Sequence, residues 1–223
     1  MHYVIGCGGG GGFTTELLAR TVPLHDICLI DGDTIEEKNL DRQMFTEDQI
    51  GMNKAHALAA RFGIVNSIPE YFPACQIDVA MINPKDILFC EADNHACRRA
   101  VLEACDQYLC RAIIAANEYT DAEAYWYEPR MKNTPNDPRV LYPIILTDRS
   151  GDPLGPPGCT GVAQEENRQL ALANDWGSAM AMQLYWFHTK ERPELPRETI
   201  NSWPVHHKVN KFAFHTISYG DRK

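Results

Sequence analysis

The sequence lacks the features of a membrane protein and of a general nucleic-acid binder. No stretch approaches about 18 consecutive apolar residues, and the N-terminus has no basic region followed by an apolar signal segment. Lys and Arg number 21 against 30 Asp and Glu, a net charge of −9, whereas binding to a phosphate backbone relies on clustered basic residues. We therefore expect a cytoplasmic protein with no membrane contact and no general affinity for nucleic acid.

The sequence also lacks any Cys-x-x-Cys pair, so no structural zinc site is predicted although the chain has eight cysteines. Most of them lie in apolar segments, where a reduced cysteine behaves as a small buried hydrophobe. Cys159 differs, because it ends a segment rich in glycine and proline just before a predicted helix over residues 164–188. A thiol at a helix N-terminus has a lowered pKa, which suits a nucleophile. The alternative is a loop cysteine whose neighbour Thr160 caps the helix.

A glycine-rich turn follows the first apolar segment of the chain. Residues 3–5 predict a short strand, and the glycines within residues 6–12 let the backbone turn tightly and approach a phosphate closely. The apolar spacing over residues 14–18 predicts a helix directly after them. The free amides at the start of that helix would point at an anion.

A second predicted strand, residues 27–30, ends at Asp31, which lies 20 residues after Gly11. Nucleotide-binding folds place an acid at this point against ribose hydroxyls. On these residues alone, the turn and the acid are also typical of an NAD-dependent dehydrogenase. A run of five glycines can equally be a flexible turn without a ligand.

A polar and cationic set follows the second strand, and its members are Asn39, Arg42, Gln43 and Lys54. Arg supplies a planar fork for phosphate oxygens and Lys a mobile charge, which suits a triphosphate better than a pyrophosphate already held by backbone amides. The other interpretation is a solvated charged face. The capping-box pattern at residues 46–49 predicts a helix start between Arg42 and Lys54 that would fix their geometry.

A carboxylate is predicted at the end of a later strand. Residues 86–90 form a buried-strand pattern, and residues 91–94 follow at the carboxyl end, where ligands bind in open α/β sheets. Asp93 offers the hard oxygen that magnesium prefers. Its other role is an N-cap for a predicted helix over residues 95–108, and both roles can hold together. Glu91 is the weaker carboxylate candidate.

The order of predicted elements indicates an α/β fold with a doubly wound, mostly parallel sheet. Strands and helices alternate up to residue 63 and again over residues 86–116, with a less regular segment between them. An aromatic strand at residues 124–127 then leads into a proline-rich loop over residues 129–157, and a loop of this length is usually functional.

The end of the chain is expected to add strands to the same domain. Residues 211–219 predict an edge strand, and the adjacent His206 and His207 read as a polar surface pair, because neighbours on an extended chain point to opposite faces. We expect residues 1–189 to form an ATP-binding domain with a crossover loop at about 129–160. Residues 190–223 would be an extension packed on that domain.

Four ordered motifs resemble the ubiquitin-activating-enzyme-like family that includes ThiF, MoeB and HesA. Its members carry a Gly-x-Gly-Gly-x-Gly turn, an Asp-x-Asp strand end, an Asn-Leu-x-Arg-Gln segment and a Gly-x-x-Lys segment. In this chain the four motifs lie at residues 6–11, 31–33, 39–43 and 51–54. The resemblance covers roughly residues 3–189 and suggests a short, stand-alone member of bacterial type.

The resemblance implies a Rossmann-like fold that uses ATP and Mg²⁺, and it assigns a role to each motif. Asp31 would contact the ribose, and Asp93, directly before an Asn, would bind the magnesium. Arg42 and Asp93 would act in catalysis. The nucleotide-binding set would be Gly6, Gly8, Gly9, Gly11, Asp31, Asp33, Asn39, Arg42, Gln43 and Lys54.

The implied reaction is adenylation of the C-terminal carboxylate of a small ubiquitin-like β-grasp protein by a homodimer. Cys159-Thr160 resembles the pair that carries the catalytic cysteine in the family's crossover loop, so a thioester could follow. Relatives also carry a helix before the first strand, with an arginine that reaches into the partner's site, and here that arginine is absent from its usual place. Adenylation of a different carboxylate, as in tRNA-modifying dehydratases, and a nucleotide-binding scaffold without turnover are the alternatives.

Overall fold

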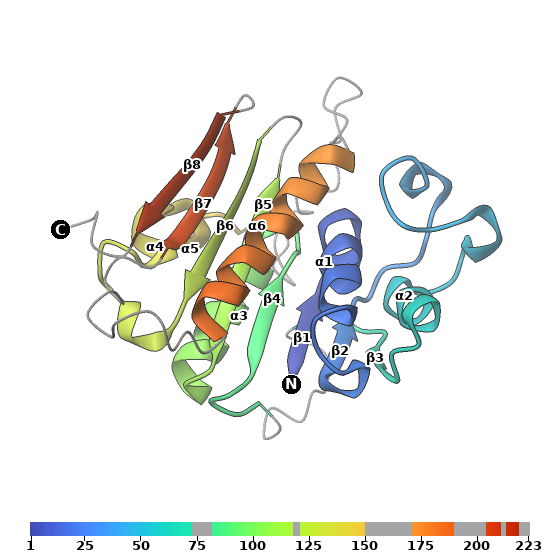
Figure 1. Cartoon of the computed structure of the whole chain (residues 1–223), viewed down its shortest axis with the longest axis horizontal. Coiled ribbons are helices and arrows are strands. Elements are labelled where there is room, and N and C mark those ends of the chain that lie inside the picture. The colour runs from blue at the N-terminus through green and yellow to red at the C-terminus, as the bar shows by residue number, and fades with distance from the viewer. Residues whose placement is uncertain (73–81, 118–120, 150–170, 190–203, 211–212, 219–223) are drawn as a thin grey trace.

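A mixed sheet, with eight strands among the described residues, runs through the molecule (Figure 1). The computed structural model describes residues 1–72, 82–117, 121–149, 171–189, 204–210 and 213–218. The strands are β1 (His2–Ile5), β2 (Ile27–Ile30), β3 (Asn66–Ile68), β4 (Ile87–Cys90), β5 (Arg111–Asn117), β6 (Ala122–Tyr127), β7 (Pro204–Asn210) and β8 (Ala213–Ser218). The helices are α1 (Gly9–Ala19), α2 (Lys54–Phe62), α3 (His95–Tyr108), α4 (Pro138–Leu141), α5 (Ile144–Thr147) and α6 (Ala171–Thr189).

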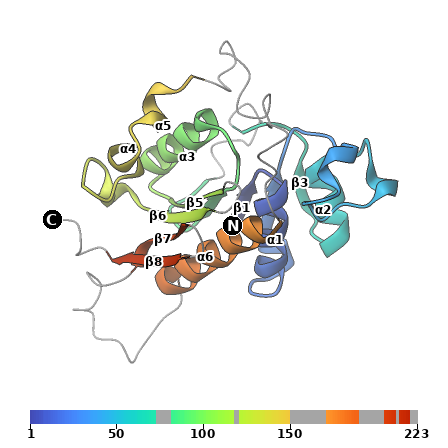
Figure 2. The same cartoon turned by 90° about the horizontal axis from the view of Figure 1, so that it is seen from above.

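The first five strands are parallel, in the order β3-β2-β1-β4-β5. Every residue of β2 and β4 is buried, as expected for parallel strands that helices cover on both faces. Figure 2 shows α1 and α6 on one face and α3, α4 and α5 on the other. Because the chain leaves β1 toward one face and β4 toward the other, the carboxyl ends of these neighbouring strands form a switch point, and open α/β sheets bind ligands in the crevice at such a point. The predicted fold class is therefore confirmed.

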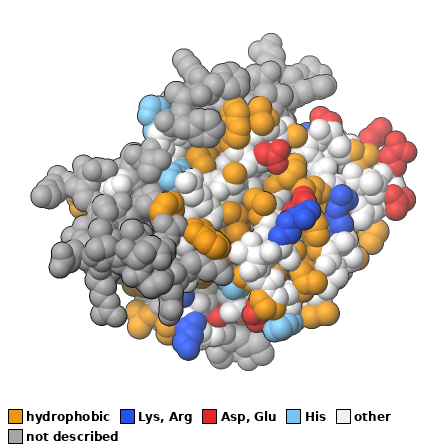
Figure 3. Space-filling view, in the orientation of Figure 1, with side chains coloured by type: hydrophobic (Ala, Val, Ile, Leu, Met, Phe, Trp, Pro, Cys, Tyr) orange, Lys and Arg blue, Asp and Glu red, His pale blue; other side chains and the backbone are white. Residues whose placement is uncertain are grey.

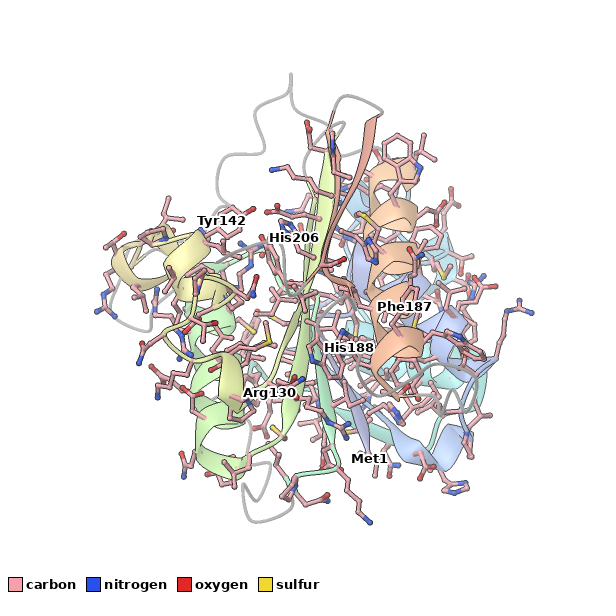
Figure 4. The ribbon with its side chains drawn as sticks, turned by 60° about the vertical axis from the view of Figure 1, so that its left-hand side comes forward. Met1, Arg130, Tyr142, Phe187, His188 and His206 are labelled. Carbon is pink, nitrogen blue, oxygen red and sulfur yellow. The ribbon has the colours of Figure 1, made fainter. Side chains whose placement is uncertain are left out.

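Three antiparallel strands extend this sheet. β6 pairs with β5, β7 with β6, and β8 with β7, so the predicted edge strand is present as β8. β7 was not predicted as a strand, and the assignment of its two histidines to the surface is wrong. His206 and His207 are 3% and 4% exposed. They do point to opposite faces, and Figure 4 shows His206 facing Tyr142 on the α4–α5 side.

The predicted helices are present with two corrections, and residues 164–170 of the helix predicted over 164–188 lie outside the described residues. α3 spans the predicted residues, but its N-cap is Asn94, whose side chain accepts a hydrogen bond from the Cys97 amide, and not Asp93. The capping box at residues 46–49 closes only a short 3₁₀ turn, Glu47–Gln49, and the helix that follows begins at Lys54 behind its own cap, Asn53.

The described part of the predicted long loop is also more regular than expected. Asp137 caps α4 by accepting from the Arg139 amide, and Pro138 takes the first helical position, where a missing N–H costs nothing. The six cysteines within the described residues are buried, as the apolar pattern predicts. Within the same residues, no helix is both long and apolar enough to cross a bilayer.

Candidate functional site

The glycine turn after β1 is packed so tightly that side chains are excluded. Gly6 has a φ of +91°, and a Cβ there would lie 2.9 Å from the Ala92 amide nitrogen. A Cβ on Gly11 would lie 1.8 Å from the Gly6 carbonyl oxygen. The amides of Gly9, Gly10 and Gly11, in the first turn of α1, meet no hydrogen-bond acceptor among the described residues. This arrangement leaves donors at the helix start for an anion.

Asp31 connects the glycine turn to the end of β2. Its carboxylate oxygens accept hydrogen bonds from the Cys7 amide at 2.6 Å and from the Asp33 amide at 2.8 Å. Burial raises the pKa of Asp31, although both amides and the charge of Lys54 act in the opposite direction. The predicted ribose acid therefore lies beside the turn and also fixes the turn's geometry.

Asp33 and Lys54 form an ion pair next to Asp31. The Lys54 Nζ lies 2.8 Å from Asp33 Oδ2, and the Tyr71 hydroxyl donates to Asp33 Oδ1 at 2.5 Å. Burial raises the pKa of Asp33, but the bonds from Lys54 and Tyr71 outweigh it, so the net shift is downward. The Tyr71 ring lies against Gly32, where a Cβ would come within 2.5 Å of it. The predicted phosphate lysine thus has a carboxylate partner in this structure.

The segment from Asn39 to Gln43 flanks the glycine turn. Asn39 is buried, and its side chain accepts from the Glu36 amide, which closes the short turn Glu37–Asn39. Arg42 donates through Nη1 to the Lys38 carbonyl and to Asp41, both within its own segment. The Gln43 side-chain amide faces Gly8, with Nε2 3.5 Å from the position of a Cβ there. Its buried Oε1 accepts no hydrogen bond from the described residues.

Asp93 follows β4 at the crevice and is exposed. None of its atoms makes a hydrogen bond or an ion pair with the described residues, so its carboxylate is available to a ligand. One free carboxylate fits magnesium bound together with a nucleotide, because this ion keeps several waters and shares substrate phosphates. The described residues hold no cluster of three or more His, Cys, Asp or Glu side chains able to bind a metal by themselves.

Glu91, two residues earlier, points toward the other face. It accepts a hydrogen bond from Thr14 Oγ1 at 2.7 Å, and its Oε2 lies 2.7 Å from the position of a Cβ on Gly10. Burial raises the pKa of Glu91 to about 7, against the effect of the Thr14 bond. This carboxyl group lies along the flank of α1, whereas the Asp93 carboxylate is exposed.

α6 supplies two contacts to the site that the sequence did not predict. Asn174 packs against Gly9, and Ser178 donates to the Gly10 carbonyl at 2.8 Å. They lie one helical turn apart, on the face that α6 turns to α1. No motif marked them, because the predicted helix over residues 164–188 read only as packing. Cys159 and residues 150–160 of the predicted crossover loop lie outside the described residues.

The ThiF family model matches residues 2–142 of this chain. Curated relatives include ubiquitin-like modifier-activating enzyme 5 of Drosophila grimshawi, 26% identical over 121 residues, and that of Aedes aegypti, 27% identical over 121 residues. Each match covers 47% of this chain and 30% of the relative. The chain therefore aligns with less than a third of these enzymes.

The fold is also that of solved structures. E. coli MccB with ATP superposes with a TM-score of 0.65 at 22% identity, over 98% of this chain and 62% of that chain. PaaA superposes with a TM-score of 0.63 at 15% identity, over 98% of this chain and 72% of that chain. The structural similarity therefore extends to the antiparallel strands β7 and β8, which lie beyond residues 2–142 of the family model. With the glycine turn, the Asp31 and Asn39–Gln43 segments and Lys54 all at one edge of a Rossmann-like sheet, the chain belongs to the ThiF family.

Proposed function

We propose that this protein binds MgATP at the crevice between β1 and β4 and adenylates a carboxylate. The observation that carries the proposal is that the amides of Gly9–Gly11, at the start of α1, meet no acceptor among the described residues and lie near the segments that carry Arg42 and Lys54. An anion at this position would gain backbone donors and two charged side chains at once. The structural neighbour MccB has been solved with ATP, and with AMPCPP together with MccA, which supports nucleotide binding by this chain.

Different residues would bind the ribose, the phosphates and the magnesium of the nucleotide. Asp31 would receive the ribose hydroxyls, and the glycine amides, Arg42 and Lys54 would hold the phosphates. Lys54 would exchange Asp33 for a phosphate oxygen, because both are anions within reach of its flexible side chain. A magnesium ion on Asp93 would neutralise charge that develops on the phosphoryl oxygens.

The carboxylate is proposed to be the C-terminus of a ubiquitin-like β-grasp protein. Its oxygen would attack the α-phosphorus, forming a mixed acyl-phosphate anhydride as the bond to the departing pyrophosphate breaks. Arg42 and Lys54 would then stabilise the charge that passes to the pyrophosphate. Cys159 would next attack the activated carbonyl, giving a thioester and releasing AMP. The ubiquitin-like modifier-activating relatives support this choice of substrate.

We propose in addition that two copies pair through the face formed by α1 and α6. Leu172 and Trp186 on α6 are 45% and 50% exposed, and Figure 3 shows hydrophobic side chains over this face with few charges among them. Large exposed apolar side chains on one face mark a candidate interaction surface. Leu172→Glu should shift a dimer to monomer in light scattering, whereas Val65→Glu, at a site 78% exposed between α2 and β3, should not. A monomeric parent protein would contradict this pairing.

Thermal unfolding with MgATP, with NAD and with neither tests the nucleotide. A ligand at about 100 times its dissociation constant adds roughly 2.7 kcal/mol of stability. We expect a rise with MgATP alone, and a rise only with NAD would overturn the proposal. Lys54→Ala should reduce the MgATP response. The matched control is Lys85→Ala, which should leave the response unchanged. Lys85 is exposed and lies just before β4, at the opposite end of the strands from the proposed site.

The carboxylate and the cysteine need separate tests. Release of pyrophosphate on addition of a β-grasp protein with a free C-terminus, and none with a C-terminally amidated copy, would support the substrate class. A conjugate that reducing agent cleaves, and that Cys159→Ser abolishes while pyrophosphate exchange continues, would support the thioester. Exchange without any conjugate would limit the activity to adenylation.

A further inference from the structure

Asn174 in the first turn of α6 touches three separate parts of the nucleotide crevice. Its Nδ2 donates to the Arg42 carbonyl at 3.2 Å, and its Oδ1 accepts from Asn117 Nδ2, at the end of β5, at 2.5 Å. Its amide group also lies against Gly9, where a Cβ would come within 2.2 Å of Nδ2. The side chain is 1% exposed. A single buried amide therefore joins the arginine segment, the glycine turn and the sheet.

The orientation of this amide follows from its neighbours. The Arg42 carbonyl can only accept a hydrogen bond, so the atom of Asn174 that faces it must be the NH₂ group. The oxygen then faces Asn117, whose NH₂ donates to it. A buried amide with both ends bonded holds its position, because the loss of either partner would leave a desolvated polar group.

We propose that Asn174 is a positioning residue that sets the distance between Arg42 and the glycine turn and thereby selects a triphosphate over a monophosphate. This inference rests on the proposed MgATP site. Among the described residues, the Arg42 guanidinium bonds only to its own segment, through Lys38 and Asp41, so the backbone contact to Asn174 is what ties Arg42 itself to the other side of the crevice. Without that bond, Arg42 would be held near the glycine turn through its neighbour Gln43, which lies against Gly8.

The choice of asparagine follows from the geometry. The flat amide of Asn174 fits directly against the backbone of Gly9, because Gly9 has no side chain to displace it. An aliphatic side chain would leave the Arg42 carbonyl without its donor, and an aspartate would place an acceptor against an acceptor. Ser178, one turn later, bonds the Gly10 carbonyl and the Asn174 carbonyl, so it holds α6 on α1 but does not reach Arg42.

The test compares MgATP with AMP binding, measured by calorimetry on the full chain. AMP lacks the β- and γ-phosphates that Arg42 would bind. A displaced Arg42 should therefore weaken the binding of MgATP and not that of AMP. We expect Asn174→Ala to weaken MgATP about fivefold to tenfold, the size of one lost hydrogen bond, and AMP less than about twofold. Leu184→Ala is the matched control on the same helix, because this fully buried side chain lies in the core, ten residues further along α6 than Asn174. It should lower the unfolding temperature and affect both ligands equally.

Two results would overturn the inference. If Asn174→Ala weakened MgATP and AMP by the same factor, as Leu184→Ala should, its role would be general packing. If the parent protein bound AMP and MgATP without preference, there would be no selection to explain. Binding of neither ligand is a different outcome, in which the proposed function itself would fail. Should Asn174→Ala not fold, Asn174→Asp keeps the shape and the acceptor for Asn117 but removes the donor to Arg42, and the same ratio decides.

Discussion

The two halves of the sheet treat their polar groups differently. Around the carboxyl ends of β1 and β4, several polar groups have no partner among the described residues, namely the glycine amides as donors, Gln43 Oε1 as an acceptor and the Asp93 carboxylate. On the face of β6 that α4 and α5 cover, charges are paired several times over, and Asp106 alone accepts from Tyr127, Lys132 and Arg139. The open polar groups of the first half would suit a bound ligand. In the second half, the ion pairs and hydrogen bonds fix the segment that carries Lys132 and Arg139.

The largest expected effect concerns two neighbouring glycines in α1. Gly11→Ala would place a Cβ 1.8 Å from the Gly6 carbonyl, a clash with backbone that no rotamer relieves, so it should destabilise the fold by about 3 kcal/mol or more. Gly12→Ala meets only Met44, at 3.6 Å, and should stabilise by up to about 1 kcal/mol through helix propensity. Urea unfolding of both variants measures the difference. Equal stabilities would show that the turn is not as tight as described.

Arg139 tests the paired half. It bonds Asp106, Asp137 and the Tyr127 hydroxyl, and its side chain is 13% exposed. Removal leaves the buried Asp137 without its cation and Asp106 with Lys132 alone, so Arg139→Ala should cost about 3 kcal/mol of unfolding free energy. Arg130→Ala removes an ion pair with Glu128 whose arginine is 56% exposed, and should cost less than about 1 kcal/mol. Neither change should alter MgATP affinity, and a loss of affinity in Arg139→Ala would join the two halves functionally.

The sequence predicted best the parts whose pattern is local. The strand at residues 27–30 and the helix at 95–108 have the bounds foreseen, because apolar runs and a cap define them without reference to the rest of the chain. β7 was missed because its histidines read as polar, and only Glu123, across the sheet, explains why a histidine is buried there. Asn174 could not be foreseen, since its partners lie 57 and 132 residues away.

Arg42 tests the open half. Arg42→Ala should leave the unfolding free energy nearly unchanged, because its contacts are to its own exposed segment. It should weaken MgATP about tenfold to a hundredfold, since a charged hydrogen bond to phosphate would be lost. Arg20→Ala, 72% exposed and paired with Glu16, removes the same charge from α1 and should have no effect on affinity. Unchanged affinity in Arg42→Ala would remove this arginine from the site.

The smallest expected effect sharpens the comparison through pH. Glu123 accepts from Tyr125 and Tyr142 and lies 3.5 Å from both His206 and Lys208. Burial raises its pKa, but these partners outweigh burial and lower the pKa to about 2. A pKa depressed by folding contributes stability that is present above the unfolded value, near 4.5, and is lost as the pH falls toward 2.

Glu123→Gln keeps the shape of the side chain and removes its charge. We expect it to cost about 1 to 2 kcal/mol at pH 7, with the difference from the parent protein shrinking by pH 4 and nearly gone by about pH 2. Glu47→Gln, an exposed carboxylate in the turn Glu47–Gln49, is the control and should match the parent at each pH. Chemical unfolding at the three pH values measures this. A cost that stays constant with pH would mean that shape and hydrogen bonding, rather than the Glu123 charge, hold β6, β7 and Tyr142 together. The contrast between a charge-paired half and an open half would then rest on Arg139 and Asp106 alone.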